Sequence, residues 1–280
     1  MDIISVDSEN ITDYSEVLPA NVAENLERSC YHAIGSGSGG SILVWKDAGR
    51  DEKVKKTVNA MILWFRAEDR EMAKQLLEEY EKRIKEAGMK ESLLRLPADT
   101  EEAVKSALVK QGFQVKLGEG STLILTLKDM VNIELLKGIP LSSHIADIGN
   151  LELLQLRKGL DICSFYHGDD MPEDLMQLPV QWFDRKLSCY IEMDGEAGGF
   201  LLVHRMPSGG LLPQLFRVIK PASGQALLEM LKYVITKASE TYSLDTQVYI
   251  PCANQSVRAF MEKLLPDKKC EREFIGSIQI

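Results

Sequence analysis

The chain has 280 residues, a length that suits one large domain or two domains of ordinary size. Its composition, 45% hydrophobic and 27% charged, is that of a globular protein and excludes disordered, collagen-like and coiled-coil classes. The formal net charge of −9, with no basic stripe, argues against a nucleic-acid partner. No apolar run of about 20 residues is present, so we expect neither a transmembrane helix nor a membrane partner.

The N-terminal residues and the cysteines indicate the compartment. Residues 1–10 are acidic and lack the basic start and apolar centre of a secretory signal. The five cysteines are odd in number, and none forms a C-x-x-C pair, so the pattern favours neither a disulfide framework nor a metal site. We therefore predict a cytoplasmic protein without a bound metal.

In the first half, strands and helices alternate. A helix is predicted over residues 69–87, because Met72, Leu76, Tyr80 and Ile84 form one apolar stripe that ends before Gly88. Strands are predicted at 61–65, 93–96 and 121–127, and a second helix at 100–110. The strand at 121–127 is expected to close the first unit.

The second half shows a similar order. Strands are predicted at 143–148, 187–193, 199–205, 211–219, 246–250 and 274–280, with helices at 151–160, 223–239 and 254–264. The apolar runs 187–193 and 199–205 predict a hairpin, and Asn254 is expected to cap the last helix. The strand at 274–280 is expected to close the second unit.

Parts of the sequence repeat at nearly constant spacing. The Ser-Cys-Tyr of 29–31 and the Gly-Gly of 39–40 recur at 188–190 and 198–199. Downstream, the helix residues Val104 and Leu108 align with Val257 and Met261. We therefore predict two tandem units, 1–135 and 142–280, each of class α+β with a mixed sheet and flanking helices.

This order, together with one glycine-containing turn, resembles the GNAT superfamily of acyl-CoA-dependent N-acyltransferases. The family begins its third helix with the pattern [Q/R]-x-x-G-x-[G/A], whose backbone N–H groups hold the coenzyme pyrophosphate. In the second unit Gly224 and Ala226 occupy the small positions of this pattern, Pro221 replaces the Gln or Arg, and Lys220 adds a nearby positive charge. The resemblance implies a site for acetyl-CoA, the expected acyl donor, formed by Val218, Ile219, Lys220, Ser223, Gly224, Gln225, Ala226 and Asn254.

The equivalent turn of the first unit differs in charge. It contains Glu68, Asp69 and Glu71 and no glycine. Carboxylates placed 4–6 Å from a pyrophosphate would each repel it by about 1 kcal/mol even in water. The same acidic residues also suit the first turn of any helix. On either interpretation, the first unit is expected to be a degenerate copy without a phosphate site.

The catalytic groups are less clearly indicated. The resemblance places a Tyr general acid in the fourth helix, but Leu108 and Met261 stand at that position in the two units. We name Glu192 and His204 as candidate bases and Tyr190 as a replacement acid on the same strand face as Glu192. Each has an alternative role: Glu192 as a solvated strand residue, His204 as a surface residue and Tyr190 as a packing residue.

Three functions remain open at this point. The favoured one is transfer of an acetyl or other acyl group from acyl-CoA to an amine, on a small molecule or a peptide, by direct attack. The second is a catalytically inactive protein that binds acyl-CoA or another ligand as a sensor or scaffold. The third is a tRNA-dependent aminoacyl transferase, as some relatives with paired GNAT folds are, although the acidic charge argues against it. We expect a monomeric pseudo-dimer or a homodimer.

Overall fold

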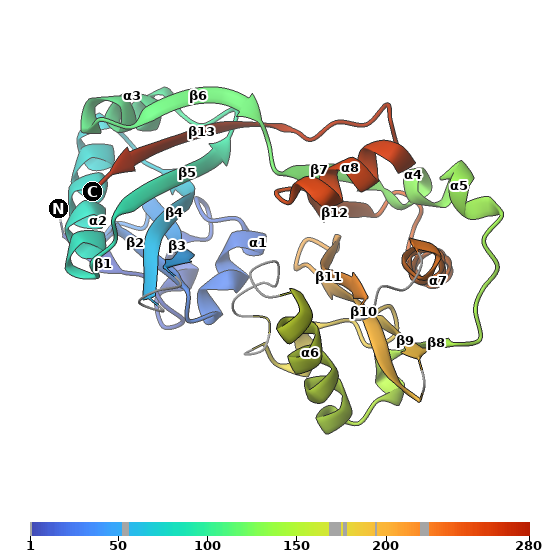
Figure 1. The fold of residues 1–280 in the computed structure, drawn as a ribbon. Coiled ribbons are helices and arrows are strands. Elements are labelled where there is room, and N and C mark those ends of the chain that lie inside the picture. The colour runs from blue at the N-terminus through green and yellow to red at the C-terminus, as the bar shows by residue number, and fades with distance from the viewer. Residues whose placement is uncertain (1, 52–55, 168–174, 176–177, 194, 219–223) are drawn as a thin grey trace. The chain divides into compact units, whose positions relative to one another are not determined.

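The computed structural model describes residues 2–51, 56–167, 175, 178–193, 195–218 and 224–280. The chain divides into two compact units (Figure 1). Unit 1 comprises Met1–Gly120 together with Arg272–Ile280, and unit 2 comprises Ser121–Glu271. None of the described helices is long and apolar enough to cross a bilayer.

Unit 1 is built on a seven-stranded mixed sheet. Only β4 and β5 pair in parallel, and the other neighbouring strands are antiparallel. Across the sheet, the strands are β1 (Ile3–Ser5), β2 (Tyr31–Ser36), β3 (Ile42–Asp51), β4 (Lys56–Arg66), β5 (Glu91–Pro97), β13 (Arg272–Gln279) and β6 (Gln114–Glu119).

Helices cover both faces of this sheet. The short α1 (Ala20–Ala23) and its flanking 3₁₀ turns lie on one face, while α2 (Arg70–Glu86) and α3 (Glu102–Gln111) pack on the other. The predicted stripe of α2 is confirmed, since Met72, Leu76, Tyr80 and Ile84 are all buried. Beyond the helix, Gly88 has φ +76°, a left-handed conformation that favours glycine and ends the helix as predicted.

Unit 2 repeats this plan on a six-stranded sheet. Again a single neighbouring pair, β11 and β12, is parallel. Across the sheet, the strands are β8 (Ile145–Asp147), β9 (Cys189–Met193), β10 (Glu196–Arg205), β11 (Leu211–Val218), β12 (Gln247–Pro251) and β7 (Thr122–Thr126).

Two hydrophobic clusters fill the faces of the unit 2 sheet. The larger cluster joins it to α7 (Gly224–Thr241) and α8 (Gln255–Leu264), with the short α4 (Leu127–Val131) and α5 (Glu134–Lys137). The smaller cluster joins the opposite face to α6 (Leu153–His167) and to the 3₁₀ turn Val180–Trp182. The Asn254 cap is confirmed, because its side-chain oxygen accepts from the amides of Ser256 and Val257.

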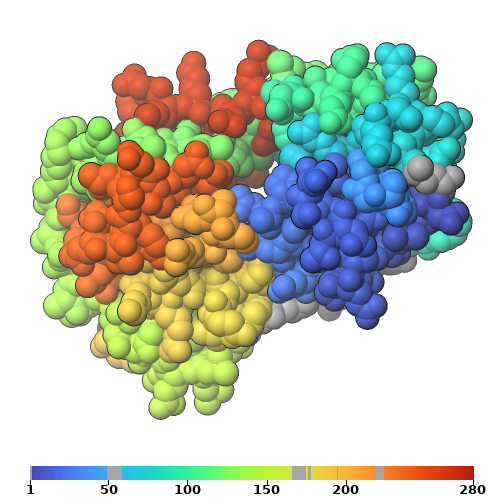
Figure 2. All heavy atoms as spheres, turned by 180° about the vertical axis from the view of Figure 1, so that it is seen from behind, coloured from blue at the N-terminus to red at the C-terminus, as the bar shows by residue number. Residues whose placement is uncertain are grey.

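The closing strands are exchanged relative to our prediction. The segment at 121–127 forms β7, which pairs with β12 of unit 2, and the C-terminal segment forms β13, which lies between β5 and β6 of unit 1 (Figure 1). In Figure 2, red atoms from the end of the chain likewise border green atoms from its middle. Alternation identifies a strand but not the sheet that it joins, so the units differ from the predicted ranges 1–135 and 142–280.

The predicted sequence repeat agrees with the structure at the helix residues but not at the glycine pairs. Leu108 and Met261 occupy equivalent buried positions in α3 and α8, as the downstream alignment predicted. The glycine pairs are not equivalent, because Gly39 and Gly40 lie in the turn between β2 and β3, whereas Gly198 and Gly199 lie inside β10. The shared order of strands and helices therefore supports the two-unit prediction better than the glycine match does.

Candidate functional site

In each unit the two parallel strands stop pairing before the first of them ends, and we call the place where they part the opening. In unit 2, β11 and β12 are joined through α7, but among the described residues they pair only at Leu211 and Val248. Beyond that pair, β11 continues to Val218. Ligands of open α/β sheets bind at the carboxyl ends of parallel strands, beside the N-terminus of the connecting helix. The opening between β11 and β12 is therefore our candidate site.

The corresponding opening of unit 1 lies between β4 and β5. Their parallel pairing runs from Asn59 with Glu91 to Ile62 with Leu94, and β4 then continues to Arg66 paired with β3 but not with β5. Both strands before the connecting helices, β4 and β11, also have an irregular register with their antiparallel partner. The two openings are thus built from the same elements.

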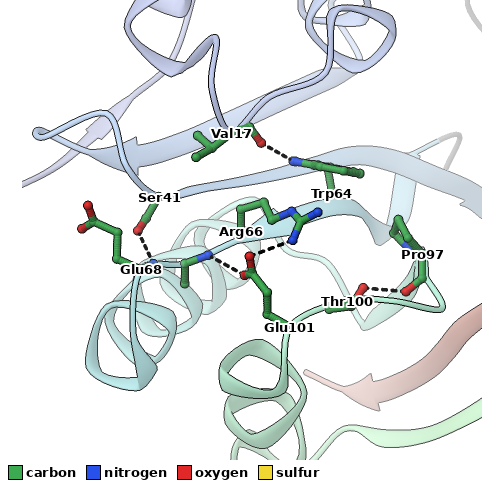
Figure 3. Close-up of polar contacts among 9 residues, drawn as sticks. Val17, Ser41, Trp64, Arg66, Glu68, Pro97, Thr100 and Glu101 are labelled. Carbon is green, nitrogen blue, oxygen red and sulfur yellow. Dashed lines mark hydrogen bonds and ion pairs between the residues drawn. The ribbon is translucent and has the colours of Figure 1, made fainter.

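In unit 1, charged side chains join the end of β4 to the start of α3 (Figure 3). Glu101, at the start of α3, accepts from the Arg66 guanidinium at 2.7 Å and from the Ala67 amide at 3.4 Å. Asp69 accepts from the Met72 amide at 2.8 Å. The Glu68 amide donates to Ser41 Oγ at 3.0 Å. Groups that would face a phosphate in this opening therefore already have partners within unit 1.

The opening of unit 2 has no carboxylate at the Glu101 position. Asn254 stands there and directs its side-chain oxygen to the amides of Ser256, at 2.8 Å, and Val257, at 3.4 Å. Arg217, which corresponds to Arg66, donates to the Phe216 carbonyl at 2.9 Å. Between β11 and α8, the rings of Phe216 and Phe260 meet edge to face, with their centroids 5.9 Å apart. The residues described at this opening therefore combine aromatic surface with uncharged or basic groups.

The predicted coenzyme residues lie around the start of α7, as far as the structure describes them. Val218 ends β11, and Gly224 is the exposed first residue of α7. A Cβ atom at Gly224 would meet no atom within 4 Å, so space is available there. Ile219, Lys220 and Ser223 lie outside the described residues.

Gln225 and Ala226, the next two predicted coenzyme residues, differ in their exposure to solvent. Gln225 is exposed and donates to Glu229 of its own helix at 2.9 Å. Ala226 is buried in the core, so only its backbone can face a ligand. Of these two residues, Ala226 could therefore contact a phosphate only through its backbone N–H group.

The candidate bases lie far apart. Glu192 is exposed, pairs with Ala197 of β10, and donates its amide to the His144 carbonyl at 2.8 Å. His204 is buried near the other end of β10. At roughly 3.3 Å per residue, Ala197 and His204 are about 23 Å apart along the strand. Glu192 and His204 therefore cannot serve the same reacting atom.

Tyr190 lies between these two positions. It pairs with Phe200 and packs, half-buried, in the cluster beneath α6. This contact fits the packing alternative. Leu108 and Met261 are both buried, so neither unit presents a titratable group at the position of the family's Tyr.

His204 belongs to a polar cluster that sequence analysis missed. Its ring stacks on Trp182 with centroids 4.3 Å apart, and its Nδ1 lies 2.7 Å from the Trp182 carbonyl. Trp182 in turn donates from Nε1 to Gln214 Oε1 at 3.0 Å. Because a carbonyl only accepts, Nδ1 must carry the proton, and in the neutral ring Nε2 carries the lone pair. The interpretation of His204 as a surface residue was wrong.

This cluster lies beside the irregularity of β11. The register shifts from Leu202 with Leu215 to Val203 with Pro213, which leaves Gln214 as the extra residue of a bulge. A proline inside an apolar strand is typical of such bulges, so Pro213 was the available signal in the sequence. The sequence around Trp182 gives no comparable sign of its contact with His204, because only the fold brings the 3₁₀ turn Val180–Trp182 next to β10.

The surroundings of Cys189 decide whether its thiol can act as a nucleophile. It is fully buried at the start of β9, and burial raises the pKa of its thiol. A thiol that stays protonated is a poor nucleophile. Cys189 is therefore a small residue of the core and not a nucleophile.

No protein-family model and no curated protein matches this sequence. Solved structures do resemble it. A tandem GNAT protein from the clavulanic acid biosynthesis pathway has a TM-score of 0.63 at 9% identity, covering 99% of this chain and 98% of that one. A GCN5-related N-acetyltransferase from Sphaerobacter thermophilus has a TM-score of 0.56 at 10% identity, with 99% and 95% covered.

A third similar structure carries a different description. The C-terminal domain (DUF2156) of a putative lysylphosphatidylglycerol synthetase from Agrobacterium fabrum has a TM-score of 0.54 at 12% identity, with 97% and 92% covered. At these identities the likeness concerns the fold alone. The fold class is therefore established: a mixed α/β chain with two helix-flanked sheets and a GNAT-like fold.

Proposed function

We propose that the protein transfers an acyl group, in the simplest case acetyl, from acyl-CoA to an amine, and that unit 2 holds the coenzyme. The observation that carries this proposal is the contrast between the two openings. In unit 1 the Arg66–Glu101 ion pair spans the opening from the end of β4 to the start of α3. In unit 2 an uncharged Asn254 stands at the Glu101 position, and an exposed glycine begins the connecting helix.

The coenzyme's parts match this arrangement. The pyrophosphate would lie at the N-terminus of α7, where unpaired backbone N–H groups and the helix dipole favour an anion. The pantetheine arm would run along β11 beside Phe216 towards the bulge at Gln214. The thioester would then lie near the cluster of His204, Trp182 and Gln214.

The chemistry follows from this placement. The amine attacks the thioester carbonyl, the C–S bond breaks, and the amine's proton must be removed. His204 is our proposed base, since its Nε2 carries the lone pair in the neutral ring. Glu192 is exposed and distant, so we no longer assign it this role. A thiolate is a good leaving group, so transfer can proceed without the family's Tyr.

Calorimetric titration with acetyl-CoA tests the coenzyme site. Gly224→Glu places a carboxylate at the start of α7, where a Cβ atom has open space, so the fold should tolerate it. We expect at least tenfold weaker binding, because each charge pair near 4 Å costs about 1 kcal/mol in water. Arg70→Glu, at the first residue of α2, is the matched control and should leave the affinity unchanged. Equal affinity in wild type and Gly224→Glu would contradict the proposed site.

The non-catalytic alternative has its own support. Buried Leu108 and Met261 replace the expected general acid, which favours a protein that binds acyl-CoA without turnover. Release of CoA thiol in the presence of an amine panel distinguishes the two. We expect release that falls at least tenfold in His204→Gln, whose side-chain amide can still donate to the Trp182 carbonyl. Binding without release would favour the sensor or scaffold.

A further inference from the structure

Unit 1 contains a cavity of about 500 Å³ beside α3 and the neighbouring strands β6 and β13 (Figure 1). This volume is within the range of pockets that hold small molecules. The α3 wall includes Lys105, Val109 and Lys110, while Val115 of β6 and Phe274 of β13 form the floor. The lining residues belong to these three elements, so the cavity is distinct from the opening between β4 and β5.

A missing side chain leaves the floor of this cavity hollow. Phe274 and Gly276 lie two residues apart on the same face of β13, and Gly276 pairs with Val115. A Cβ atom at Gly276 would lie 2.8 Å from Val115 Cγ1 and 2.6 Å from the Gln114 carbonyl oxygen, so a larger residue would force a shift. The floor therefore combines the Val115 side chain and the Phe274 ring with bare backbone beside them.

Apolar side chains around the cavity remain open to solvent. Val109 is 55% exposed on α3, and Leu117, which pairs with Phe274, is 44% exposed on β6. Since β6 is the edge strand of the unit 1 sheet, no further strand of this sheet covers them. An apolar group placed against Val109, Val115 and Phe274 would remove this surface from water, which is favourable.

Two lysines give the cavity its charge. The Lys105 ammonium lies over the Phe274 ring, 5.6 Å from its centroid, and donates to the Ala98 carbonyl at 3.3 Å. An ammonium has three protons, so Lys105 keeps donors for a ligand. Lys110 is exposed and forms no ion pair with any residue that the structure describes.

One carboxylate also lines the cavity, at the far end of the helix. Glu102 stands in the first turn of α3, whereas Lys110 stands in the last. Eight residues separate them, about 12 Å along the helix axis. A ligand anion held between Lys105 and Lys110 would therefore meet two ammonium groups and leave Glu102 to one side.

We propose that this cavity binds a small organic carboxylate with an apolar body, either an aryl or a short acyl group. Its carboxylate lies between the ammonium groups of Lys105 and Lys110, and its apolar body packs against Val109, Val115 and Phe274. This inference does not depend on the proposed acyltransferase function, because no residue of the unit 2 opening takes part.

Methyl NMR of the full-length protein tests the site. The methyl groups of valine and leucine are labelled with ¹³C, and the protein is titrated with 1-naphthoate and, separately, with octanoate. We expect one or both acids to shift the signals of Val109 and Val115 along saturable curves. The variants Val109→Ile and Val115→Ile each remove one set of signals and so assign them. If neither acid moves these signals, the proposed site is wrong, even where other signals respond.

Neutral analogues test the need for a negative charge. The alcohols 1-naphthalenemethanol and 1-octanol carry the same apolar bodies without a carboxylate. We expect them to bind about fivefold more weakly, or less, because they gain no attraction from the ammonium groups. Equal affinities for an acid and its alcohol would overturn the assigned role of the lysines.

Charge variants locate the carboxylate. Lys110→Glu changes an exposed side chain, so the fold should tolerate it, and it should weaken binding of the acids about fivefold or more. Lys116→Glu is the matched control, because Lys116 follows Val115 on β6 and points to the opposite face of the sheet. Its affinity should equal that of wild type. Equal weakening in both variants would indicate a general effect of charge and would overturn the site.

A third variant tests the apolar part of the cavity without changing its charge. Val109→Trp places a large ring at an exposed position of the α3 wall and should fill the cavity. We expect the Val115 signals to stop responding to either acid. Unchanged titration curves would show that the ligand lies elsewhere.

Discussion

The two openings of this molecule show how one arrangement of strands and helices can be closed or left available by a few side chains. At the end of β4, Glu101 takes hydrogen bonds from Arg66 and from the Ala67 backbone. In unit 2, Asn254 accepts from the amides of Ser256 and Val257 in its own helix. In unit 1 the Glu101 carboxylate thus lies where the phosphate of a ligand would have to bind. The comparison therefore teaches that the charge of the side chains at the opening, rather than the order of strands and helices, distinguishes the two units.

The first way to test this comparison removes the strand that unit 1 takes from the far end of the chain. Deletion of residues 272–280 leaves β5 and β6 without the strand that lies between them. We expect unit 1 to lose its cooperative fold, because β6 then lacks its only neighbouring strand and β5 lacks one of its two. Limited proteolysis and urea unfolding measure this loss.

The control for this deletion is the removal of residues 2–5, which include the edge strand β1. That change should destabilise unit 1 much less, since β1 has a single neighbour. Similar losses in the two deletions would show that β13 does not complete the sheet as described.

The second test changes Asn254 at the opening of unit 2. Asn254→Glu gives unit 2 a carboxylate at the helix position that Glu101 holds in unit 1. We expect acetyl-CoA binding to weaken at least tenfold, by repulsion of phosphate. Asn254→Ser retains a capping oxygen without charge and should bind nearly as wild type does. If calorimetry finds equal affinities in all three proteins, charge at the opening does not control access.

The smallest expected effect concerns Asp129 of unit 2. This carboxylate accepts from the backbone and hydroxyl of Thr126 and pairs with Lys268 at 2.9 Å. The hydrogen bond from the Thr126 backbone, followed by that from Lys268, lowers its pKa from 3.8 to about 2. Because the folded-state pKa is lowered, the stabilisation is fully present above about pH 4 and is lost as the pH falls through 2.

Urea unfolding at several pH values checks this expectation. Asp129→Asn should unfold with about 1 kcal/mol less free energy than wild type at pH 6, a modest figure because the pair is partly exposed. The difference between the two proteins should shrink towards pH 2. A difference that stays constant over this range would mean that the charge of Asp129 is not what stabilises the contact.

Local features of the fold were accessible from the sequence. The apolar stripe of α2, its end at Gly88 and the Asn254 cap follow from spacing and from the chemistry of single residues. The acidic character of the opening in unit 1 could also be predicted from Glu68 and Asp69. Such features depend on neighbours within a few residues, and for that reason the sequence reports them well.

Features that depend on distant partners were not accessible. Nothing in the alternation of β7 or β13 indicates which sheet accepts it, and either choice buries the same apolar face. The pairing of Trp182 with His204 likewise depends on how a 3₁₀ turn meets β10. The ion pair of Arg66 with Glu101 joins residues from two elements that only the folded sheet brings together.

The exchange of closing strands has a consequence for synthesis. A ribosome makes residues 1–120 before unit 2, yet the strand that fills the gap between β5 and β6 is made only after unit 2. Unit 2 can assemble as soon as residue 271 has emerged, while unit 1 must wait with two unpaired strand edges. We therefore expect the first-made half of the nascent chain to be the last to become protease-resistant, the reverse of the usual order for proteins with two successive domains.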